Sequence, residues 1–317
     1  MDALSGTLSL LEVHGSVFCR AALSRPYAVH TKSSEAAIFH VIVRGAGWIE
    51  VEGMDRPTPF RAGDLLVLPH GHPHVLCDPP GTRSVHIRAL PCDPGSDGLP
   101  CVHHGGGGVD TSILCGSFRF GAEARAALLP SLPPLIAASG TAGSTAAWLD
   151  ATLRLLADEV ASNRPGAAIV VERLADVLFI QALRAWVAQQ QDQGGSWLVA
   201  LGDPQLSRAL AALHHHPGQP WTAARLARAA GMSRSAFYQR FERVVGEAPA
   251  AYVTRWRMLV ARRGLRRGDS INEVAERVGY TSEAAFSRAF KRAVGASPSV
   301  WRREAVSEVG GPWQKPL

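Results

Sequence analysis

The sequence predicts an α+β protein with an N-terminal β-barrel, a helical hairpin and an all-α C-terminal domain. Short apolar segments broken by Gly and Pro fill residues 13–120, and apolar residues recur at three- and four-residue steps after residue 122. A 49-residue repeat occupies the last hundred residues. We therefore expect three domains, at residues 1–120, 121–196 and 203–303, in a chain of 317 residues that is long enough for separate cores.

The N-terminal part has the composition of several short β-strands. Apolar residues gather in five segments that Gly and Pro interrupt, at residues 38–43, 47–51, 64–68, 85–90 and 113–120. Strands this short at such spacing predict a sandwich or a barrel. Residues 91–110 are rich in turn-forming residues and predict a mobile loop.

Two amphipathic helices are predicted after the barrel. Leu153, Leu156 and Val160 recur at helical spacing before a Pro-Gly break at residues 165–166. A second stripe follows, with Val170, Leu174, Val177, Leu178 and Leu183. These stripes exceed what one face of a thin barrel covers, so we expect the hairpin at residues 146–190 to form a homodimer. Packing within one chain is the alternative.

A Gln- and Gly-rich linker is predicted at residues 189–196, before the C-terminal domain. Asp203 can cap a helix that Pro204 begins. The run of three histidines at residues 214–216 is expected at the end of that helix, where His complements the helix dipole.

The internal repeat predicts two helix-turn-helix units. The segment LARAAGMS at residues 226–233 recurs as VAERVGYTS at residues 274–282, and the pair Phe237 and Phe241 recurs as Phe286 and Phe290. In each copy a Gly suits a left-handed turn and a Ser can cap the second helix. Residues four apart share one helix face, so each Phe pair is expected in a core. A helical run at residues 250–265, about 24 Å long, joins the copies.

The face opposite each Phe pair is predicted to reach the base edges of DNA, since the second helix of such a unit enters the major groove. The expected base-facing residues are Arg234, Ser235, Tyr238 and Gln239 in the first unit and Glu283, Ala284, Ser287 and Arg288 in the second. Arg288 is the first choice for direct readout, because Arg can donate two hydrogen bonds to guanine. For any single side chain, a solvated surface position is the alternative.

Charge supports a polyanionic partner for this region. Residues 221–303 carry 17 basic and 6 acidic side chains, a net charge of +11, whereas the whole chain carries +6 and the remainder therefore about −5. The expected phosphate contacts are Arg243, Arg255, Arg257, Lys291 and Arg292.

These motifs resemble the AraC family of bacterial transcription regulators, over residues 203–303. The resemblance implies two helix-turn-helix units joined by a linker helix and a sequence-specific regulator that binds double-stranded operator DNA. We further expect control by an unknown small-molecule or ion effector in the N-terminal part, a homodimer, and RNA polymerase as a partner if the regulator is an activator.

The segment GDLLVLPHGHPH at residues 63–74 has the spacing of the second cupin motif, and His40 and Trp48 fall where a first motif belongs. The N-terminal part thus resembles the cupin-type sensory domain of some AraC-family regulators, which implies a cupin-like barrel with an effector pocket at His40, Trp48 and His74. His40 and His74 are also the candidate ligands of a divalent metal. Purely structural histidines are a further alternative.

Val41 and Ile42 stand where cupin enzymes supply a second metal-binding His. We therefore do not expect an enzyme, and the alternative is a metal-dependent cupin enzyme with a DNA-binding appendage. The sequence has no apolar run of transmembrane length and no basic start typical of a secretory signal, so a cytoplasmic protein without a membrane partner is expected. Its five cysteines form no C-x-x-C pair and are expected to be reduced.

Overall fold

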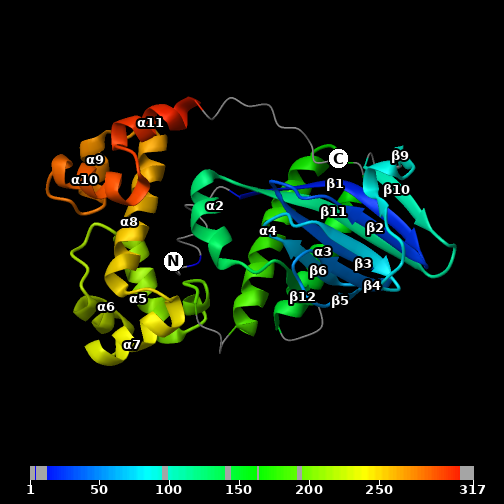
Figure 1. Ribbon diagram of the computed structural model, residues 1–317, viewed down its shortest axis with the longest axis horizontal. Helices are drawn as coiled ribbons and strands as arrows, with labels where there is room; N and C mark the ends of the chain where they lie inside the picture. The colour runs from blue at the N-terminus through cyan, green and yellow to red at the C-terminus, as the bar shows by residue number, and fades with distance from the viewer. Residues whose placement is uncertain are drawn as a thin grey trace. The chain divides into compact units, whose positions relative to one another are not determined.

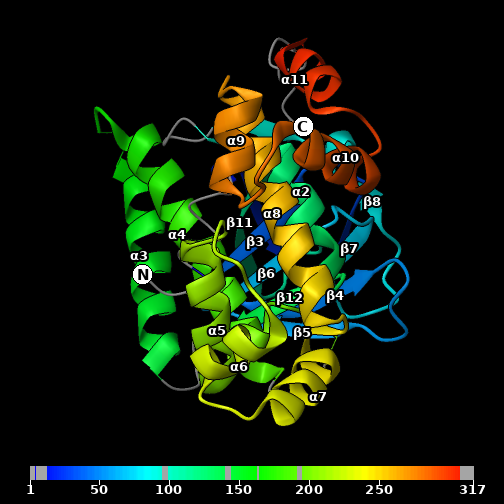
Figure 2. The same ribbon diagram turned by 90° about the vertical axis from the view of Figure 1, so that its left-hand side faces the viewer.

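The computed structural model describes residues 4, 13–94, 99–139, 144–162, 164–190 and 195–307. These residues form two compact units (Figures 1 and 2). The first, the barrel unit, holds Val13–Phe120 and Leu132–Trp186. The second, the helical unit, holds Gly121–Ser131 and the described chain from Val187 onward.

Two β-sheets form the barrel unit. The seven-stranded sheet has the order β12-β6-β3-β11-β1-β10-β9, and the five-stranded sheet has the order β5-β4-β7-β2-β8. The strands are β1 (Val13–Ser24), β2 (Tyr27–Thr31), β3 (Ala37–Arg44), β4 (Ala46–Val51), β5 (Thr58–Arg61), β6 (Asp64–Leu68), β7 (His74–Asp78), β8 (Val85–His86), β9 (Cys92–Pro94), β10 (Pro100–Gly105), β11 (Asp110–Phe120) and β12 (Ile136–Ser139).

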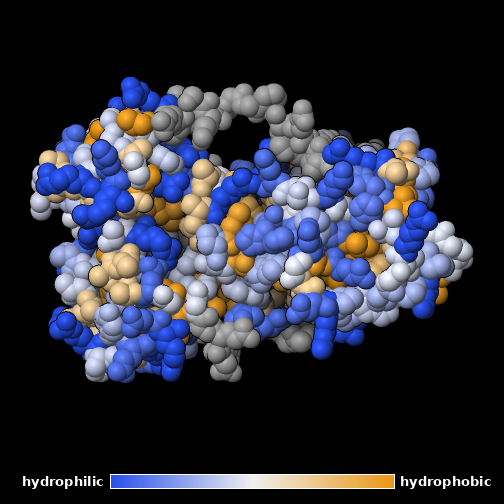
Figure 3. Space-filling view, viewed as in Figure 1, coloured by the Kyte–Doolittle hydropathy of each residue, from blue (hydrophilic) through white to orange (hydrophobic). Residues whose placement is uncertain are grey.

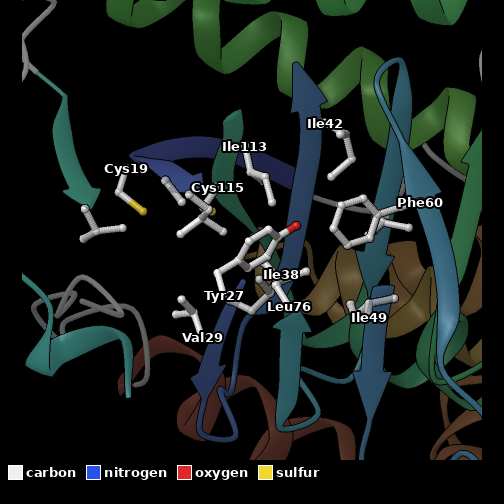
Figure 4. Packing of buried hydrophobic residues seen from close by; sticks show 14 of the residues in the cluster. Cys19, Tyr27, Val29, Ile38, Ile42, Ile49, Phe60, Leu76, Ile113 and Cys115 are labelled. Carbon is white, nitrogen blue, oxygen red and sulfur yellow. The ribbon is translucent and has the colours of Figure 1, made fainter. Parts of the chain in front are cut away.

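Apolar side chains from both sheets fill the space between them (Figure 4). In β1, Cys19, Ala21 and Leu23 are buried and alternate with partly exposed residues, as expected for a strand with one face in the core. Gly71 makes the turn between β6 and β7 with φ of +63°, and a Cβ atom there would lie 2.1 Å from the carbonyl oxygen of Ser34. Only Gly fits this turn, which leads the chain directly to His74.

The strands at residues 38–43, 47–51, 64–68 and 113–120 are confirmed as β3, β4, β6 and β11. The prediction for residues 85–90 is only partly right, since β8 ends at His86 and a 3₁₀ helix follows at Ile87–Ala89.

The loop predicted at residues 91–110 is wrong for much of its length, because this stretch contains β9 and β10. β10 pairs in parallel with the long strand β1, with Cys101 opposite Arg20. Backbone hydrogen bonds to a distant strand therefore outweigh the local preference of Gly and Pro for turns.

The hairpin helices are α3 (Ser144–Ser162) and α4 (Ala167–Gln189), and the break between them lies at the predicted residues. α4 packs on the seven-stranded sheet, where the amide of Gly15 donates to Asp176 Oδ1 at 2.8 Å. The ring of Phe179 also lies 5.1 Å from that of Phe118. In the part of the chain that the structure describes, no helix combines the length and apolarity needed to cross a membrane.

Eight described helices build the helical unit: α2 (Ala122–Leu128), α5 (Pro204–His215), α6 (Ala223–Ala230), α7 (Arg234–Val245), α8 (Pro249–Arg266), α9 (Ile271–Arg277), α10 (Glu283–Val294) and α11 (Pro298–Ser307). The first helix-turn-helix unit is α6 with α7, and the second is α9 with α10. α8 joins them, and its 18 residues make it about 27 Å long.

The two Phe pairs occupy the predicted core positions. Phe237 and Phe241 are buried, and Phe241 contacts Tyr252 of α8 edge to face at 5.6 Å. Phe286 and Phe290 are buried with Val274 and Leu265 in a second cluster. Each helix-turn-helix unit therefore has an aromatic core that includes residues of α8.

The predicted division at residues 121–203 needs correction. α2 joins the helical unit, where the Glu123 carboxylate pairs with the Arg266 guanidinium of α8 at 3.0 Å. Its neighbour β12 returns to the seven-stranded sheet, so residues 121–143 are not part of the hairpin.

The helical unit also begins before the predicted start at Asp203. Trp197 is buried, and its indole N–H donates to the carbonyl oxygen of Ala127 at 3.2 Å. The predicted linker is thus wrong for Gly195 and Ser196, whose amides both donate to the Val244 carbonyl oxygen. Residues 191–194 of that linker lie outside the described residues.

His214 lies in the core of the helical unit, which its predicted place at the end of a helix did not indicate. It is 7% exposed, stacks on Trp256 with ring centroids 3.6 Å apart, and its Nε2 lies 2.8 Å from the Tyr252 hydroxyl. Its neighbour His215 follows the prediction and lies in the last turn of α5. His214 therefore links α5 to α8 inside the helical unit.

We predict that Phe286→Ala destabilises the helical unit by about 3–5 kcal/mol, because it removes a fully buried ring and leaves a cavity. Urea denaturation, monitored by the circular dichroism signal of the α-helices, measures this change in the free energy of unfolding. The exposed neighbour Arg288→Ala is the control and should shift the free energy of unfolding by less than about 0.5 kcal/mol. An unchanged midpoint for Phe286→Ala would contradict the assignment of this ring to the core.

Candidate nucleic-acid interface and barrel site

Hydrogen bonds of the predicted kind begin both recognition helices. The Ser233 hydroxyl accepts from the amide of Ala236 at the start of α7, and the Ser282 hydroxyl accepts from the amide of Ala285 at the start of α10. Before them, Gly231 and Gly279 have φ of +69° and +81°. The turns therefore need Gly, and the caps set where each recognition helix begins.

The first recognition helix presents a polar face to solvent. Arg234, Ser235, Tyr238 and Gln239 are all exposed, and these four residues line a hollow of about 520 Å³. Tyr238 is 41% exposed. Ser235 and Gln239 lie opposite the buried Phe pair of this helix, as the spacing predicts. Arg234 and Tyr238 flank that pair, three residues before Phe237 and Phe241.

The second recognition helix presents a smaller and more charged face. Glu283, Ala284 and Arg288 are exposed, whereas Ser287 is half-buried beside the aromatic core. The face offers a carboxylate acceptor, a methyl group and a guanidinium donor. It therefore differs chemically from the first face.

The candidate phosphate-binding residues divide into two groups. Arg243, Lys291 and Arg292 lie on the last turns of the recognition helices and are exposed. Arg255 is exposed but pairs with Glu247 Oε1 at 2.6 Å. The Arg257 guanidinium donates to the carbonyl oxygens of Pro217 and Gln219 at 2.8 and 2.7 Å, so this side chain holds the loop after α5.

The visible surface of the helical unit is mostly hydrophilic (Figure 3). Such a surface, with a net charge of +11 over residues 221–303, attracts the phosphate backbone of nucleic acid.

The structure brings His40 and His74 together inside the barrel unit. Their Nε2 atoms lie 2.8 Å apart, and both side chains are almost fully buried. His74 Nδ1 lies 3.0 Å from the carbonyl oxygen of His72, which can only accept a hydrogen bond. His74 Nε2 is therefore the acceptor for His40 Nε2–H, and His40 Nδ1 accepts from the Cys115 thiol at 3.3 Å.

This hydrogen-bond chain requires both imidazoles to be neutral. Burial holds the pKa of His40 well below its usual value, and the neighbouring His74 lowers that pKa further by a smaller amount. Burial also lowers the pKa of His74 to about 4. The neutral pair is thus the stable form at physiological pH.

The residues present do not fit the divalent metal considered from the sequence. Among the described residues, no group of three His, Cys, Asp or Glu side chains is arranged to hold a metal ion. Two imidazoles on one tetrahedral ion would also hold their nitrogens about 3.3 Å apart, farther than the 2.8 Å separation here. We therefore derive no metal chemistry for this pair.

Trp48 does not join the histidine pair. It precedes the buried Ile49 of the barrel core, so the alternation of the strand directs Trp48 to the other face of β4. The structure thus separates this residue from the other two members of the predicted effector pocket.

A hollow of about 600 Å³ opens instead on the outer face of the seven-stranded sheet. There His103, Ala22, Ser112 and Arg44 stand opposite one another in a row across β10, β1, β11 and β3. The two central side chains are small, and the outer two are basic and form the rims. This hollow could not be predicted from the sequence, because it depends on strand β10 and its register with β1.

Comparisons with known families agree with this architecture. Residues 2–188 match the family described as Cupin, and residues 226–304 match a family described as Helix-turn-helix domain. A crystal structure of the DNA-binding domain of AdpA with a target DNA is 35% identical, covers 34% of this chain and 96% of that chain, and has a TM-score of 0.32.

Similarity to whole regulators extends over nearly the full chain. An AraC-like transcription regulator of Streptomyces antibioticus is 33% identical over 96% of this chain and 100% of that protein. The transcriptional regulator AlkR of Acinetobacter baylyi is 30% identical over 96% of this chain and 100% of its own length. Together with the duplicated helix-turn-helix units and the barrel, these relatives establish that the chain belongs to the AraC family and is a DNA-binding transcription regulator with a cupin domain.

Proposed function

We propose that α7 and α10 enter two successive major grooves on one face of an operator duplex. The observation that carries this proposal is the pair of capped helices, each with a buried Phe pair on one side and an exposed polar face on the other. Successive major grooves on one face of a duplex lie about 34 Å apart. Helix α8, about 27 Å long, can span this distance together with the widths of α7 and α10.

The base-facing residues proposed for the first helix are Arg234, Ser235, Tyr238 and Gln239, and those for the second are Glu283, Ala284, Ser287 and Arg288. Gln239 can donate to and accept from adenine, and Arg288 can bind guanine with two hydrogen bonds. Arg243, Lys291 and Arg292 would contact phosphates, with Arg255 after release from Glu247. Arg257 is left out, since its donors bind carbonyl oxygens of the chain.

The hairpin is proposed to hold a second copy of the chain. Leu155 of α3 and Ile169 and Val177 of α4 are 58%, 64% and 38% exposed, although all three are aliphatic. Exposed aliphatic side chains on neighbouring helices favour association. A homodimer would place four recognition helices on one operator.

A small molecule bound by the barrel unit is proposed to control DNA binding. The hollow between Arg44 and His103 supports a polar ligand, whereas the core around His40 and His74 is filled by side chains. The ligand would act by binding one conformational state of the regulator better than another. An activating outcome would add RNA polymerase as a partner, and such a regulator works in the cytoplasm.

An enzymatic role is not part of this proposal. The cupin enzyme with a DNA-binding appendage needs a metal, and the histidine pair lacks a third ligand in the described residues. The relatives at about 30% identity are named as transcription regulators.

Mapping genomic binding sites of the full chain tests the proposal directly. Enrichment of one sequence motif, retained in competition with excess random DNA, is the expected result. Binding that random DNA abolishes would indicate a basic protein without sequence preference. The genes beside the sites would then guide the choice of small molecules for a thermal-shift screen, with Arg44→Ser as the control for the hollow.

We predict that Arg288→Ala and Lys291→Ala affect DNA binding differently. Arg288→Ala should reduce discrimination at one operator base pair by about 1–3 kcal/mol, because two hydrogen bonds to guanine are lost. Lys291→Ala should weaken binding to all sequences about equally and lower the salt dependence by about one ion. Binding-site selection and titrations at several salt concentrations measure both effects. An unchanged selected motif would remove Arg288 from direct readout.

We predict that Ile169→Glu converts a dimeric full-length chain to a monomer, because a charge on the apolar hairpin face must then be desolvated. Val109→Glu is the matched control, since Val109 is 73% exposed and lies away from the hairpin. Sedimentation velocity of the three proteins distinguishes the outcomes. A monomeric wild-type chain, or a dimeric Ile169→Glu variant, would reject the hairpin as the dimer surface.

A further inference from the structure

Cys19 and Cys115 lie side by side in the core of the barrel unit (Figure 4). Cys19 of β1 stands directly opposite Cys115 of β11 in the antiparallel ladder. The two side chains are 0% and 2% exposed. The sequence separates these residues by 96 positions, so the fold alone makes them a pair.

The pairing of β1 with β11 brings these two residues close enough for a disulfide to be considered. Residues directly opposite each other in antiparallel strands have Cα atoms about 4.5 or 5.5 Å apart. Both values fall within the range of about 4.4–6.8 Å that a disulfide spans. The pairing therefore places the two residues within reach of a disulfide, next to a β-bulge between Val17 and Cys19.

The other three cysteines have different surroundings. Cys77 lies in the five-stranded sheet, with its Sγ atom 3.6 Å from Glu50 Oε1. Cys92 stands opposite Val102, whereas Cys101 stands opposite Asp93, so these two side chains point to opposite faces of their sheet. Among the described cysteines, only Cys19 and Cys115 stand opposite each other in a strand pair.

A proton acceptor stands beside the pair. His40 Nδ1 lies 3.3 Å from Cys115 Sγ and accepts the hydrogen bond of that thiol, while His40 Nε2–H donates to His74. The neighbouring Cys19 thiol, and burial after it, hold the pKa of the Cys115 thiol well above its usual value. The resting pair is thus two protonated thiols, and proton removal must accompany any attack by sulfur.

We propose that Cys19 and Cys115 form an oxidation site at which a small hydroperoxide converts the two thiols to a reversible cross-strand disulfide. Cys115 Sγ attacks one peroxide oxygen and passes its proton to His40 Nδ1 as the O–O bond breaks. With hydrogen peroxide, the departing hydroxide takes up that proton as water and leaves a Cys115 sulfenic acid. Cys19 Sγ then attacks the sulfenic sulfur, and its proton leaves with the hydroxyl group as a second water.

In the complete reaction, two thiols lose two electrons and two protons, and one hydrogen peroxide becomes two waters. A small uncharged oxidant suits the site, because burial disfavours a bulky or charged reagent. Oxidation also removes the thiol proton that His40 Nδ1 accepts, and the histidine pair then loses one of its buried hydrogen bonds. The inference rests on the barrel unit alone and does not depend on the proposed function.

Peptide mass spectrometry of the full-length chain tests the proposal. The protein is treated with hydrogen peroxide and then denatured in the presence of iodoacetamide, which alkylates the remaining thiols. The alkylated protein is then digested. We expect one linked species that joins the Cys19 and Cys115 peptides, 2 Da lighter than their sum, and its loss after dithiothreitol. Alkylated Cys19 and Cys115 at oxidant concentrations that convert the exposed Cys92 to sulfenic acid would overturn the proposal.

Single-residue variants and a melting experiment provide further checks on the disulfide. Cys77→Ser should leave the linked species unchanged, because Cys77 lies in the other sheet. His40→Gln should slow formation of the disulfide at least tenfold, as expected when a positioned base is lost. Oxidised wild-type protein should melt roughly 10 °C higher than reduced protein, since the disulfide closes a long loop. Equal melting temperatures together with alkylated thiols would show that no cross-link forms.

Discussion

The burial of two phenylalanines four residues apart is the constraint on which each DNA-reading unit depends. Phe237 with Phe241 and Phe286 with Phe290 can enter a core only when one helix face turns inward. The opposite face, with Tyr238 in one helix and Arg288 in the other, must then face solvent. Recognition chemistry at these helices is thus a geometric consequence of aromatic packing, and the polar residues can vary without loss of the fold.

The sequence was sufficient for the parts of the fold that local patterns encode. The repeat located both helix-turn-helix units, and the caps at Ser233 and Ser282 fixed the starts of their second helices. It was insufficient where distant segments decide the outcome. Strand β10 has a turn-rich composition but pairs with β1, and His214 looks like a helix-end residue until α8 brings Tyr252 and Trp256 against it. Such pairings depend on long-range contacts that composition does not carry.

The candidate sites, like the fold, could be predicted where local sequence patterns determine them but not where distant segments do. The residues of α7 and α10 that are proposed to face bases could be named from helical spacing. Arg257 shows, however, that a basic residue on the linker helix can bind the chain's own carbonyl oxygens. In the barrel unit the cupin spacing correctly brought His40 near His74, but it could not show that these imidazoles satisfy each other or that Trp48 faces away. The pairing of Cys19 with Cys115 required the strand register.

Helix α2 makes the helical unit discontinuous in sequence. Its residues lie upstream of the hairpin, yet Glu123 pairs with Arg266 and the carbonyl of Ala127 receives the indole of Trp197. A fragment cut at residue 203 would keep all four helices of the DNA-reading motifs but would remove the carboxylate partner of Arg266. Swapping the C-terminal hundred residues between such regulators therefore transfers an incomplete module, and a chimera retains its native packing only if α2 is exchanged as well.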